Sequence, residues 1–297
     1  MATGVTTNTF SENSYLTIAE YKNAPTSIDF DNLVVGGNAN AQDGELSRVI
    51  LRASSYLDEY LNQNLVADTQ TETQRTRITP QGYVSLHPNR NPIISLSSFE
   101  YGSDPNGLTS MSDPSQSWFE NQQIIIPLSQ LSTTYSSAGP LAFGGNLGSR
   151  TQIYCKYTYV AGFVNTTLAS AANAAATSLT VKSGAGILAG AQLRIYDGAN
   201  QETVTVASNY TYGSTTVPLT AGLTYAHAVG VAIGNMPNAI KEAAILITTA
   251  LIKVRGDNSM TMNITTQPSA NLSTGTSRYG SEIQLALDMV DKYRRVR

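Results

Sequence analysis

The chain has few charged residues for its length. Asp, Glu, Lys and Arg make up 13% of its 297 residues, about half the usual share, and Ser, Thr, Asn, Gln and Gly take their place. This composition favours β-rich, closely assembled surfaces over those of a freely solvated enzyme. The formal net charge is -3, so the chain lacks the overall basic excess that nucleic-acid-binding proteins use to neutralise phosphates. Any contact with nucleic acid must therefore be local.

The sequence also lacks long apolar runs. No stretch approaches the roughly 20 apolar residues that span a bilayer. The N-terminal residues have neither the basic start nor the apolar core of a signal peptide. Cys155 is the single cysteine, so no internal disulfide can form. We therefore expect synthesis in a host cytoplasm and no membrane partner.

Residues suited to catalysis or metal binding are scarce. With only His87 and His227 present, a multi-histidine metal site is excluded, and we expect both to be surface or turn residues. Cys155 lies in an alternating strand pattern, which favours a small buried hydrophobe over a nucleophile. The stretch 197–202 lacks the ligand spacing of a calcium loop, and 144–149 lacks the Lys-Ser/Thr of a phosphate-binding loop. We therefore expect no enzymatic activity, no catalytic or metal site and no cofactor.

Two helices are predicted near the N-terminus. Thr17 and Glu20 have the spacing of a capping box at the start of a short helix, which Pro25 then ends. A Gly/Asn-rich stretch leads into an amphipathic helix at 44–63, whose apolar residues recur at i, i+3, i+4 and i+7. The side chains expected to pack this helix are Leu46, Val49, Ile50, Ala53, Leu57 and Leu61.

Between residues 72 and 163 the apolar period changes to two. Alternating segments separated by Pro, Gly, Asn and Asp clusters indicate a small antiparallel sheet. These segments are 73–78, 82–86, 92–102, 122–128 and 151–163. The Gly- and Ser-rich stretch 132–150 is expected to be a long loop.

The next segment, 164–235, has a pattern of its own. It contains short β-branched runs at a spacing typical of an all-β sandwich or barrel. These runs are 177–181, 191–198, 202–208, 215–220 and 229–233. We interpret the segment as a β domain inserted into the surrounding fold.

Two further helices are predicted after this segment. Pro237 suits a first helical turn, and the helix is expected to pack through Ile240, Ala243, Ala244, Ile247 and Leu251. A polar tract at 257–278 separates it from a last helix that begins near Ser281, and the chain ends with "KYRRVR". These cations could complement a helix dipole, or the Arg and Tyr side chains could dock onto a partner.

With 164–235 set aside, the order of elements resembles the head-to-tail connector, or adaptor, proteins of tailed bacteriophages. The inserted segment itself resembles small β modules that phage structural proteins carry. The resemblance covers most of 15–163 and 236–297. It is carried by Tyr15, Leu16, Thr17, Glu20 and Tyr21, the helix 46–61, Pro92, Ile93 and 95–102, Tyr157, Tyr159, Ala161, Gly162 and Phe163, Pro237, Ile240 and Ala243, and Tyr293, Arg294 and Arg295.

The resemblance implies an α+β fold, in which a helical adaptor core with a small antiparallel sheet carries an inserted all-β domain. The implied domains are a discontinuous core at 1–163 and 236–297, the inserted domain at 164–235, a linker at 257–278, and a C-terminal helix and docking tail at 279–297. It also implies a homo-oligomeric ring in the virion neck, expected to be twelve-fold, beneath the portal protein. Such a ring holds the next neck or tail protein and extends the channel for genomic DNA, without sequence-specific binding. The implied portal-docking residues are Tyr293, Arg294, Arg295 and Arg297.

Two alternatives remain open. A head-completion stopper or tail-terminator ring would be built more purely from strands, so the helices predicted at 44–63 and 237–255 argue against it. A glycan-binding tail module could form around the inserted segment, because tyrosines can stack on sugars. Its candidate residues are Tyr196, Tyr210, Tyr212 and Tyr225.

Overall fold

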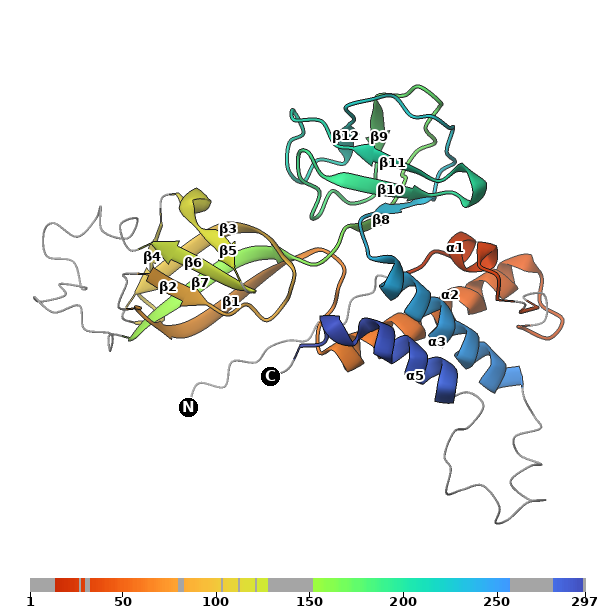
Figure 1. Ribbon diagram of the computed structural model, residues 1–297, viewed down its shortest axis with the longest axis horizontal. Coiled ribbons are helices and arrows are strands. Elements are labelled where there is room, and N and C mark those ends of the chain that lie inside the picture. The colour runs from red at the N-terminus through yellow and green to blue at the C-terminus, as the bar shows by residue number, and fades with distance from the viewer. Residues whose placement is uncertain are drawn as a thin grey trace, which may run out of the picture. The chain divides into compact units, whose positions relative to one another are not determined.

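The chain folds into two compact units, which Figure 1 shows as a ribbon. In this computed structural model the described residues are 14–26, 28–29, 33–79, 83–102, 104–111, 113–120, 122–127, 152–256 and 280–295. Unit 1 consists of 1–66 and 164–297, and unit 2 of 67–163. The loop expected at 132–150 and the linker expected at 257–278 lie outside the described residues.

The first helix, α1 (Ile18–Asn23), begins as the sequence predicts. The Thr17 hydroxyl accepts the backbone N–H of Glu20, and the Glu20 carboxylate accepts the backbone N–H of Thr17, so the predicted capping box is confirmed. The helix ends before Ala24, the residue that precedes Pro25 and is therefore biased toward extended backbone.

The second helix, α2 (Ala39–Leu61), starts earlier than the predicted residue 44, within the Gly/Asn-rich stretch. Asn38 is the N-cap, and its side chain accepts the N–H of Ala41 at 3.0 Å. The amide of Gln42 then bonds both the N–H and the C=O of Val34, each at 2.8 Å. The Asn38 cap and the Gln42 side chain therefore stabilise the first turn of α2, although its Gly/Asn-rich composition is typical of a loop.

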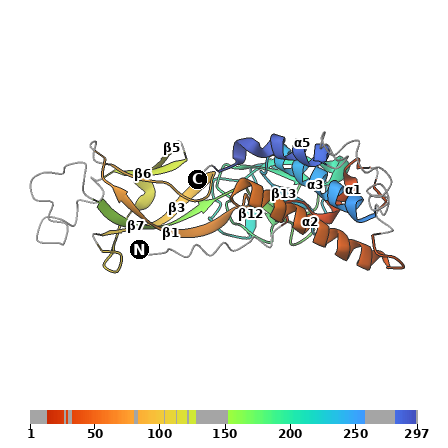
Figure 2. The same ribbon diagram turned by 90° about the horizontal axis from the view of Figure 1, so that it is seen from below.

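Helices from both ends of the chain form one bundle in unit 1. α2 packs against α3 (Asn238–Gly256), and α3 packs against α5 (Gly280–Val290). The side chains predicted to pack these helices are buried, except for Leu251, which is half-buried. The burial on α3 is wider than the predicted stripe and includes Lys241, Thr248 and Thr249. Figure 2 gives the reason, since α2 and α5 lie on opposite sides of α3.

The rest of unit 1 is a β module with its own core. Its elements are β8 (Asn165–Thr167), β9 (Ser178–Thr180), β10 (Gln192–Tyr196), the 3-10 turn η4 (Gly198–Asn200), β11 (Glu202–Thr205), β12 (Thr216–Pro218) and β13 (Ala232–Gly234). β11, β10, β13 and β8 form one antiparallel sheet, and β12 pairs with β9. Each predicted run overlaps one of the other strands, although β13 extends one residue beyond the run 229–233. β8 was not predicted because Asn-Thr-Thr has no apolar alternation.

Unit 2 is built from two antiparallel sheets that share one hydrophobic core. Its elements are β1 (Asp68–Arg77), β2 (Tyr83–Leu86), β3 (Ile93–Gly102), β4 (Thr109–Ser110), η1 (Pro114–Gln116), β5 (Trp118–Glu120), β6 (Gln123–Pro127) and β7 (Gln152–Ala161). The strand orders are β1-β7-β3-β4 and β2-β6-β5. With the bundle of unit 1, these sheets make the fold α+β.

The division into units differs from the predicted domain boundaries. The contacts place 164–235 with the helices and leave the sheets of 67–163 as the separate unit. Contacts between the β module and the helices of unit 1 account for this grouping. An inserted domain at 164–235 therefore remains a proposal.

Candidate functional site

The C-terminal segment is bound to the end of α2, and we call residues 60–63 with residues 291–295 the C-terminal anchor. The 3-10 turn η5 (Asp291–Tyr293) follows α5 directly. The Gln63 side chain donates to the Tyr293 carbonyl at 2.7 Å, and the Arg295 N–H donates to the Leu61 carbonyl at 3.0 Å. The Asn62 amide donates to the Arg295 carbonyl at 3.2 Å. The tail therefore satisfies a carbonyl that a helix end otherwise leaves unpaired.

The sequence of α2 explains why the tail meets it at this point. Asn62 is the C-cap and adopts the left-handed conformation, with φ 55° and ψ 23°. Among non-glycine residues, Asn tolerates this conformation well, so it can end the helix and turn the chain. The last turn of α2 contains no basic residue. Arg294, whose guanidinium lies 4.9 Å from the centre of the Tyr60 ring, supplies a cation near the negative end of the helix dipole.

Two polar groups of the anchor have unusual surroundings. The Tyr60 hydroxyl donates to the Asp291 carboxylate at 2.9 Å, and this hydrogen bond is the main cause of a raised Tyr60 pKa. Nη1 of Arg295 is buried and has no hydrogen-bond partner among the described residues. Tyr293, Arg294 and Arg295 thus lie together on α2, with Arg294 exposed. Arg297, the fourth residue predicted to dock, lies outside the described residues.

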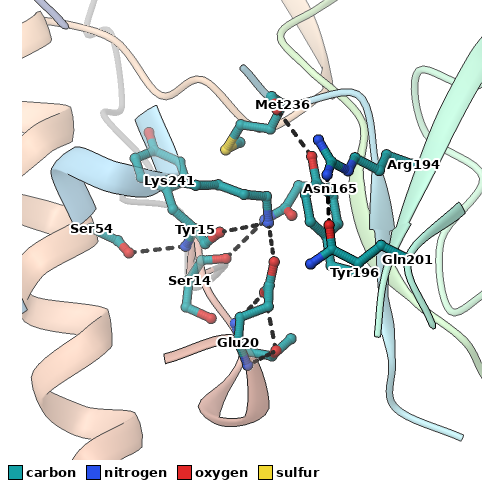
Figure 3. Close-up of polar contacts among 11 residues, drawn as sticks. Ser14, Tyr15, Glu20, Ser54, Asn165, Arg194, Tyr196, Gln201, Met236 and Lys241 are labelled. Atoms are coloured by element: carbon teal, nitrogen blue, oxygen red, sulfur yellow. Dashed lines mark hydrogen bonds and ion pairs between the residues drawn. The ribbon is translucent and has the colours of Figure 1, made fainter. Parts of the chain in front are cut away.

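A second polar cluster joins the β module to the helices within unit 1, and Figure 3 shows this module junction. Lys241 of α3 forms an ion pair with Glu20 of α1. Its Nζ also lies 3.4 Å from the Tyr15 carbonyl and 4.1 Å from the centre of the Tyr196 ring, which belongs to β10. The Asn165 amide donates to the Ser14 carbonyl at 2.9 Å. Residues from four distant parts of the sequence therefore meet in this junction.

Burial makes the module junction energetically important. The side chains of Lys241 and Glu20 are each 8% exposed, and breaking a buried ion pair by removing one partner costs about 3–5 kcal/mol. Glu20 also completes the capping box of α1. Burial is the main cause of a raised pKa at Tyr196, and the nearby Glu20 carboxylate adds to it. The sequence marked Glu20 only as a cap, and no spacing rule links it to a lysine 221 residues away.

A cleft of about 530 Å³ lies beside the module junction, between α1, α3 and the turn after β10. Its charged lining residues include three carboxylates and three cations, namely Glu20, Glu242, Glu282, Arg194, Lys241 and Lys253. Two of the cations are already paired, because Lys241 binds Glu20 and Lys253 binds Glu282 at 2.7 Å. This balance gives the cleft no preference for a cationic or an anionic ligand.

The first and last residues of the β module are bonded to each other. Val164 N–H donates to the Asn235 side chain at 2.7 Å, and Asn235 N–H donates to the Val164 carbonyl at 3.0 Å. Next to them, Asn165 of β8 is paired with Gly234 of β13. A segment whose ends meet in this way can be inserted between two elements without separating them.

His227 is buried and forms a β-bridge with Ala172, so the expectation of a surface or turn histidine was wrong. Its ring lies between two carboxylates, with Nδ1 2.8 Å from Asp197 and Nε2 2.8 Å from Glu202. Burial acts most strongly on the Glu202 pKa and raises it, but hydrogen bonds from Thr224, His227 and Tyr225 together outweigh burial and lower this pKa. The carboxylates of the stretch 197–202 thus hold a histidine.

The other residues considered for chemistry have structural surroundings. His87 is exposed, as predicted. Cys155 is fully buried, as predicted, and burial raises its thiol pKa to about 12. Across the described ranges, no three His, Cys, Asp or Glu side chains are arranged to hold a metal ion. Within the same ranges, no helix has the length and apolar character needed to span a membrane.

The four tyrosines considered for glycan stacking do not form one exposed set. Tyr196 lies in the module junction, where its hydroxyl donates to the Met236 carbonyl at 3.2 Å. Tyr210 is buried, and its hydroxyl donates to the Ser214 carbonyl at 2.8 Å. Tyr212 and Tyr225 are 45% and 42% exposed.

Comparisons with known proteins give one distant structural match. No family model and no curated protein matches the chain. Among solved structures, the chain is similar to one from the neck of an empty GTA particle computed with C6 symmetry. The identity is 12% and the TM-score 0.36, over 96% of this chain and 95% of the other. A TM-score this low does not establish a shared fold.

Proposed function

We propose that this chain is a structural subunit of the neck of a tailed-phage particle. Copies of it form a ring beneath the portal, which joins the capsid vertex to the next neck or tail protein and extends the DNA channel. The observation that carries this proposal is the single bundle formed by α2, α3 and α5. Helices from the two ends of the chain meet there in the order in which the adaptor family has them, although 176 residues separate α2 from α3.

The proposed function is mechanical. A head-to-tail contact repeated about an axis closes into a ring, and many modest contacts between two rings add up to a stable joint through multivalency. DNA passes through the lumen without sequence-specific binding, and no cofactor takes part. We expect the subunit to be made in the host cytoplasm and to act in the virion.

In this proposal the tail docks onto the portal through Tyr293, Arg294, Arg295 and Arg297. The C-terminal anchor supports this role because it already holds 293–295 against α2. A segment that is ordered before binding loses less conformational entropy when it binds. Arg294 is exposed, and its planar guanidinium can form bidentate hydrogen bonds with a carboxylate.

We also propose that 164–235 is an inserted domain that projects from the neck. Its own hydrophobic core supports this assignment, as do the bonds between Val164 and Asn235 that bring its ends together. Its partner would be a neighbouring capsid or tail protein.

Electron microscopy of the purified protein mixed with the portal of the same particle tests the function. The full chain is expected to add a ring beneath the portal, whose subunits can be counted against the expected twelve. A chain ending at Asp291, which lacks the proposed docking residues, is expected to leave the portal bare. Arg294→Ala should weaken the addition, whereas Lys182→Ala, which removes an exposed cation from the β module, should not.

The outcomes separate the parts of the proposal. A ring that persists after truncation at Asp291 would keep the neck function and move the docking surface away from the tail. A full chain that never adds to the portal would overturn the neck function.

A further inference from the structure

The outer face of α2 presents a mixed basic and apolar surface, which we call the α2 stripe. It consists of Arg48, Leu51, Arg52 and Tyr56, and the i, i+3, i+4 and i+8 spacing places them on one side of the helix. The Arg48 and Arg52 side chains are 73% and 58% exposed. Leu51 and Tyr56 are 37% and 44% exposed, although Leu46, Ile50 and Leu57 bury the opposite side of the same helix.

The α2 stripe carries two exposed cations, Arg48 and Arg52, and the exposed Glu59 lies beyond Tyr56 toward the end of the helix. Both arginines are near one carboxylate, that of Glu45, at 3.4 Å from Arg48 and 4.0 Å from Arg52. The Glu45 side chain is only 11% exposed, so it lies beneath the arginines and offers little surface to a partner. The guanidinium groups extend outward and can each bind a further carboxylate.

The outer face of α5 presents the complementary surface, which we call the α5 stripe. It consists of Gln284, Leu285 and Asp288, all exposed, and Leu285 is 54% exposed. The Gln284 amide donates to the Asp288 carboxylate at 2.8 Å, which fixes the orientation of the acid. Ala286 and Val290 bury the other side of α5. Each stripe therefore combines an exposed leucine with charge, and the two stripes have opposite signs.

Within one molecule α2 and α5 each pack mainly against α3 (Figure 2) and touch each other only slightly. The two stripes are exposed and do not cover each other. A second copy can bring its α5 stripe to the α2 stripe. Two different surfaces then meet, so the contact is head-to-tail, and the joined pair retains one free stripe of each kind. Such a contact propagates into a ring when its rotation closes.

We propose that the α2 stripe of one copy binds the α5 stripe of a second copy and that this contact joins neighbouring subunits. The proposal rests on the ring assembly described above and assigns its surfaces. Burial of Leu51, Tyr56 and Leu285 supplies most of the attraction. The pairing of the arginines with Asp288 sets which surfaces meet, since exposed ion pairs add little affinity but like charges oppose a wrong pairing.

Charge reversal on the full-length chain tests the contact. The first variant is Arg48→Glu with Arg52→Glu, and the second is Asp288→Arg. Sedimentation, together with ring formation on the portal, measures assembly. Each variant alone is expected to self-associate at least about tenfold more weakly, because like charges face each other. An equimolar mixture is expected to assemble again, since every contact in an alternating ring then joins opposite charges.

Two controls support the reading of this experiment. Lys182→Glu in the β module and Glu242→Arg on α3 reverse exposed charges outside both stripes and should leave assembly unchanged.

A crosslinking test uses Leu51→Cys in one chain and Leu285→Cys in another. The natural thiol of Cys155 is fully buried, so the disulfide between chains is expected only when the two variants are mixed.

The outcomes distinguish this contact from the neck function. Assembly on the portal that survives both reversals would overturn the contact and leave the function standing. Crosslinking of Leu51→Cys to Leu285→Cys in a protein that never adds to the portal would support the contact and overturn the function. A full chain that never self-associates, with or without the portal, would overturn both.

Discussion

At the scale of single residues, Gly234 illustrates how closely the ends of the β module approach each other. A Cβ at this position would lie 2.1 Å from the Val164 carbonyl oxygen, so Gly234→Ala must force β13 away from β8. We expect a loss of at least about 2 kcal/mol in the free energy of unfolding, measured with urea, since overpacking typically costs 1–3 kcal/mol.

Gly44 is the matched control, because a Cβ there would have no atom within 4 Å and the residue lies inside α2. Gly44→Ala should stabilise the chain by about 0.5–1 kcal/mol through its higher helix propensity. Equal effects of the two substitutions would contradict the steric argument.

The Asp197, His227 and Glu202 cluster predicts acid sensitivity of the β module. The Glu202 carboxylate accepts the backbone N–H groups of Thr224 and Tyr225 and lies 2.8 Å from the His227 ring. The Glu202 pKa is lower in the folded than in the unfolded chain, and the unfolded chain therefore takes up the proton first as pH falls. The stabilisation is complete well above the ordinary glutamate pKa of about 4.3 and is lost as pH falls through the lower, folded value.

Glu202→Gln should remove this acid-dependent contribution. We expect faster amide hydrogen exchange in peptides covering 192–234 at pH 7. The increase should correspond to a loss of about 1–3 kcal/mol in the free energy of opening this region. The difference from the natural chain should shrink below about pH 4. Glu242→Gln, at an exposed position on α3, serves as the control. It should change neither the exchange rate of these peptides nor its dependence on pH. A difference that stays constant with pH would show that Glu202 acts through packing rather than charge.

At the scale of elements, the module junction links α1, α3 and β10 through Lys241. Lys241→Met leaves the buried Glu20 carboxylate without its cation, and we expect a loss of about 3–5 kcal/mol in stability. Adding Glu20→Gln should recover part of this loss, because Gln keeps the capping role at the same position and carries no charge. The free energies of the single and double variants, measured with urea, give the coupling.

The ion pair between Lys22 and Asp43 provides the comparison for this test. These side chains are 39% and 41% exposed, so Lys22→Met should change stability by less than about 1 kcal/mol. Similar losses for Lys22→Met and Lys241→Met would show that burial does not set the strength of the Lys241 pair.

The sequence predicted those elements whose signals are local. The capping box at Thr17 and Glu20, the apolar face of α2 and the alternation of β7 each depend on neighbours within a few residues. β8 was missed because its three polar residues become a strand only by pairing with β13. The first turn of α2 was missed because Gln42 stabilises it through a contact with Val34.

The polar sites were harder to predict because their partners are distant in sequence. Lys241 contacts Glu20, and His227 contacts Asp197 and Glu202, across intervals with no fixed spacing. The tail residues were identified by their composition, but their attachment to α2 depends on backbone groups at Leu61 and Arg295. Composition carries no information about such bonds.

At the scale of the whole molecule, the C-terminal anchor couples the end of the chain to the bundle. A chain that ends at Asp291 loses the bonds from Gln63, Asn62 and Leu61 to the tail. We expect faster amide hydrogen exchange in the last turns of α2 and α5, with little change in the β module. Protection that is unchanged at the end of α2 would show that the tail does not stabilise the bundle.

The last prediction concerns the β module as a whole. Val164 and Asn235 are bonded to each other, so a short Gly-Ser linker can take the place of 164–235. Tyr196 is lost from the module junction, but Lys241 keeps its ion pair with Glu20, and the α2 and α5 stripes are untouched. We therefore expect the shortened chain to fold, with helical circular dichroism retained, and to add to the portal like the full chain. Loss of α2 and α3 on deletion would instead make the module an integral part of unit 1 and remove the support for an inserted domain.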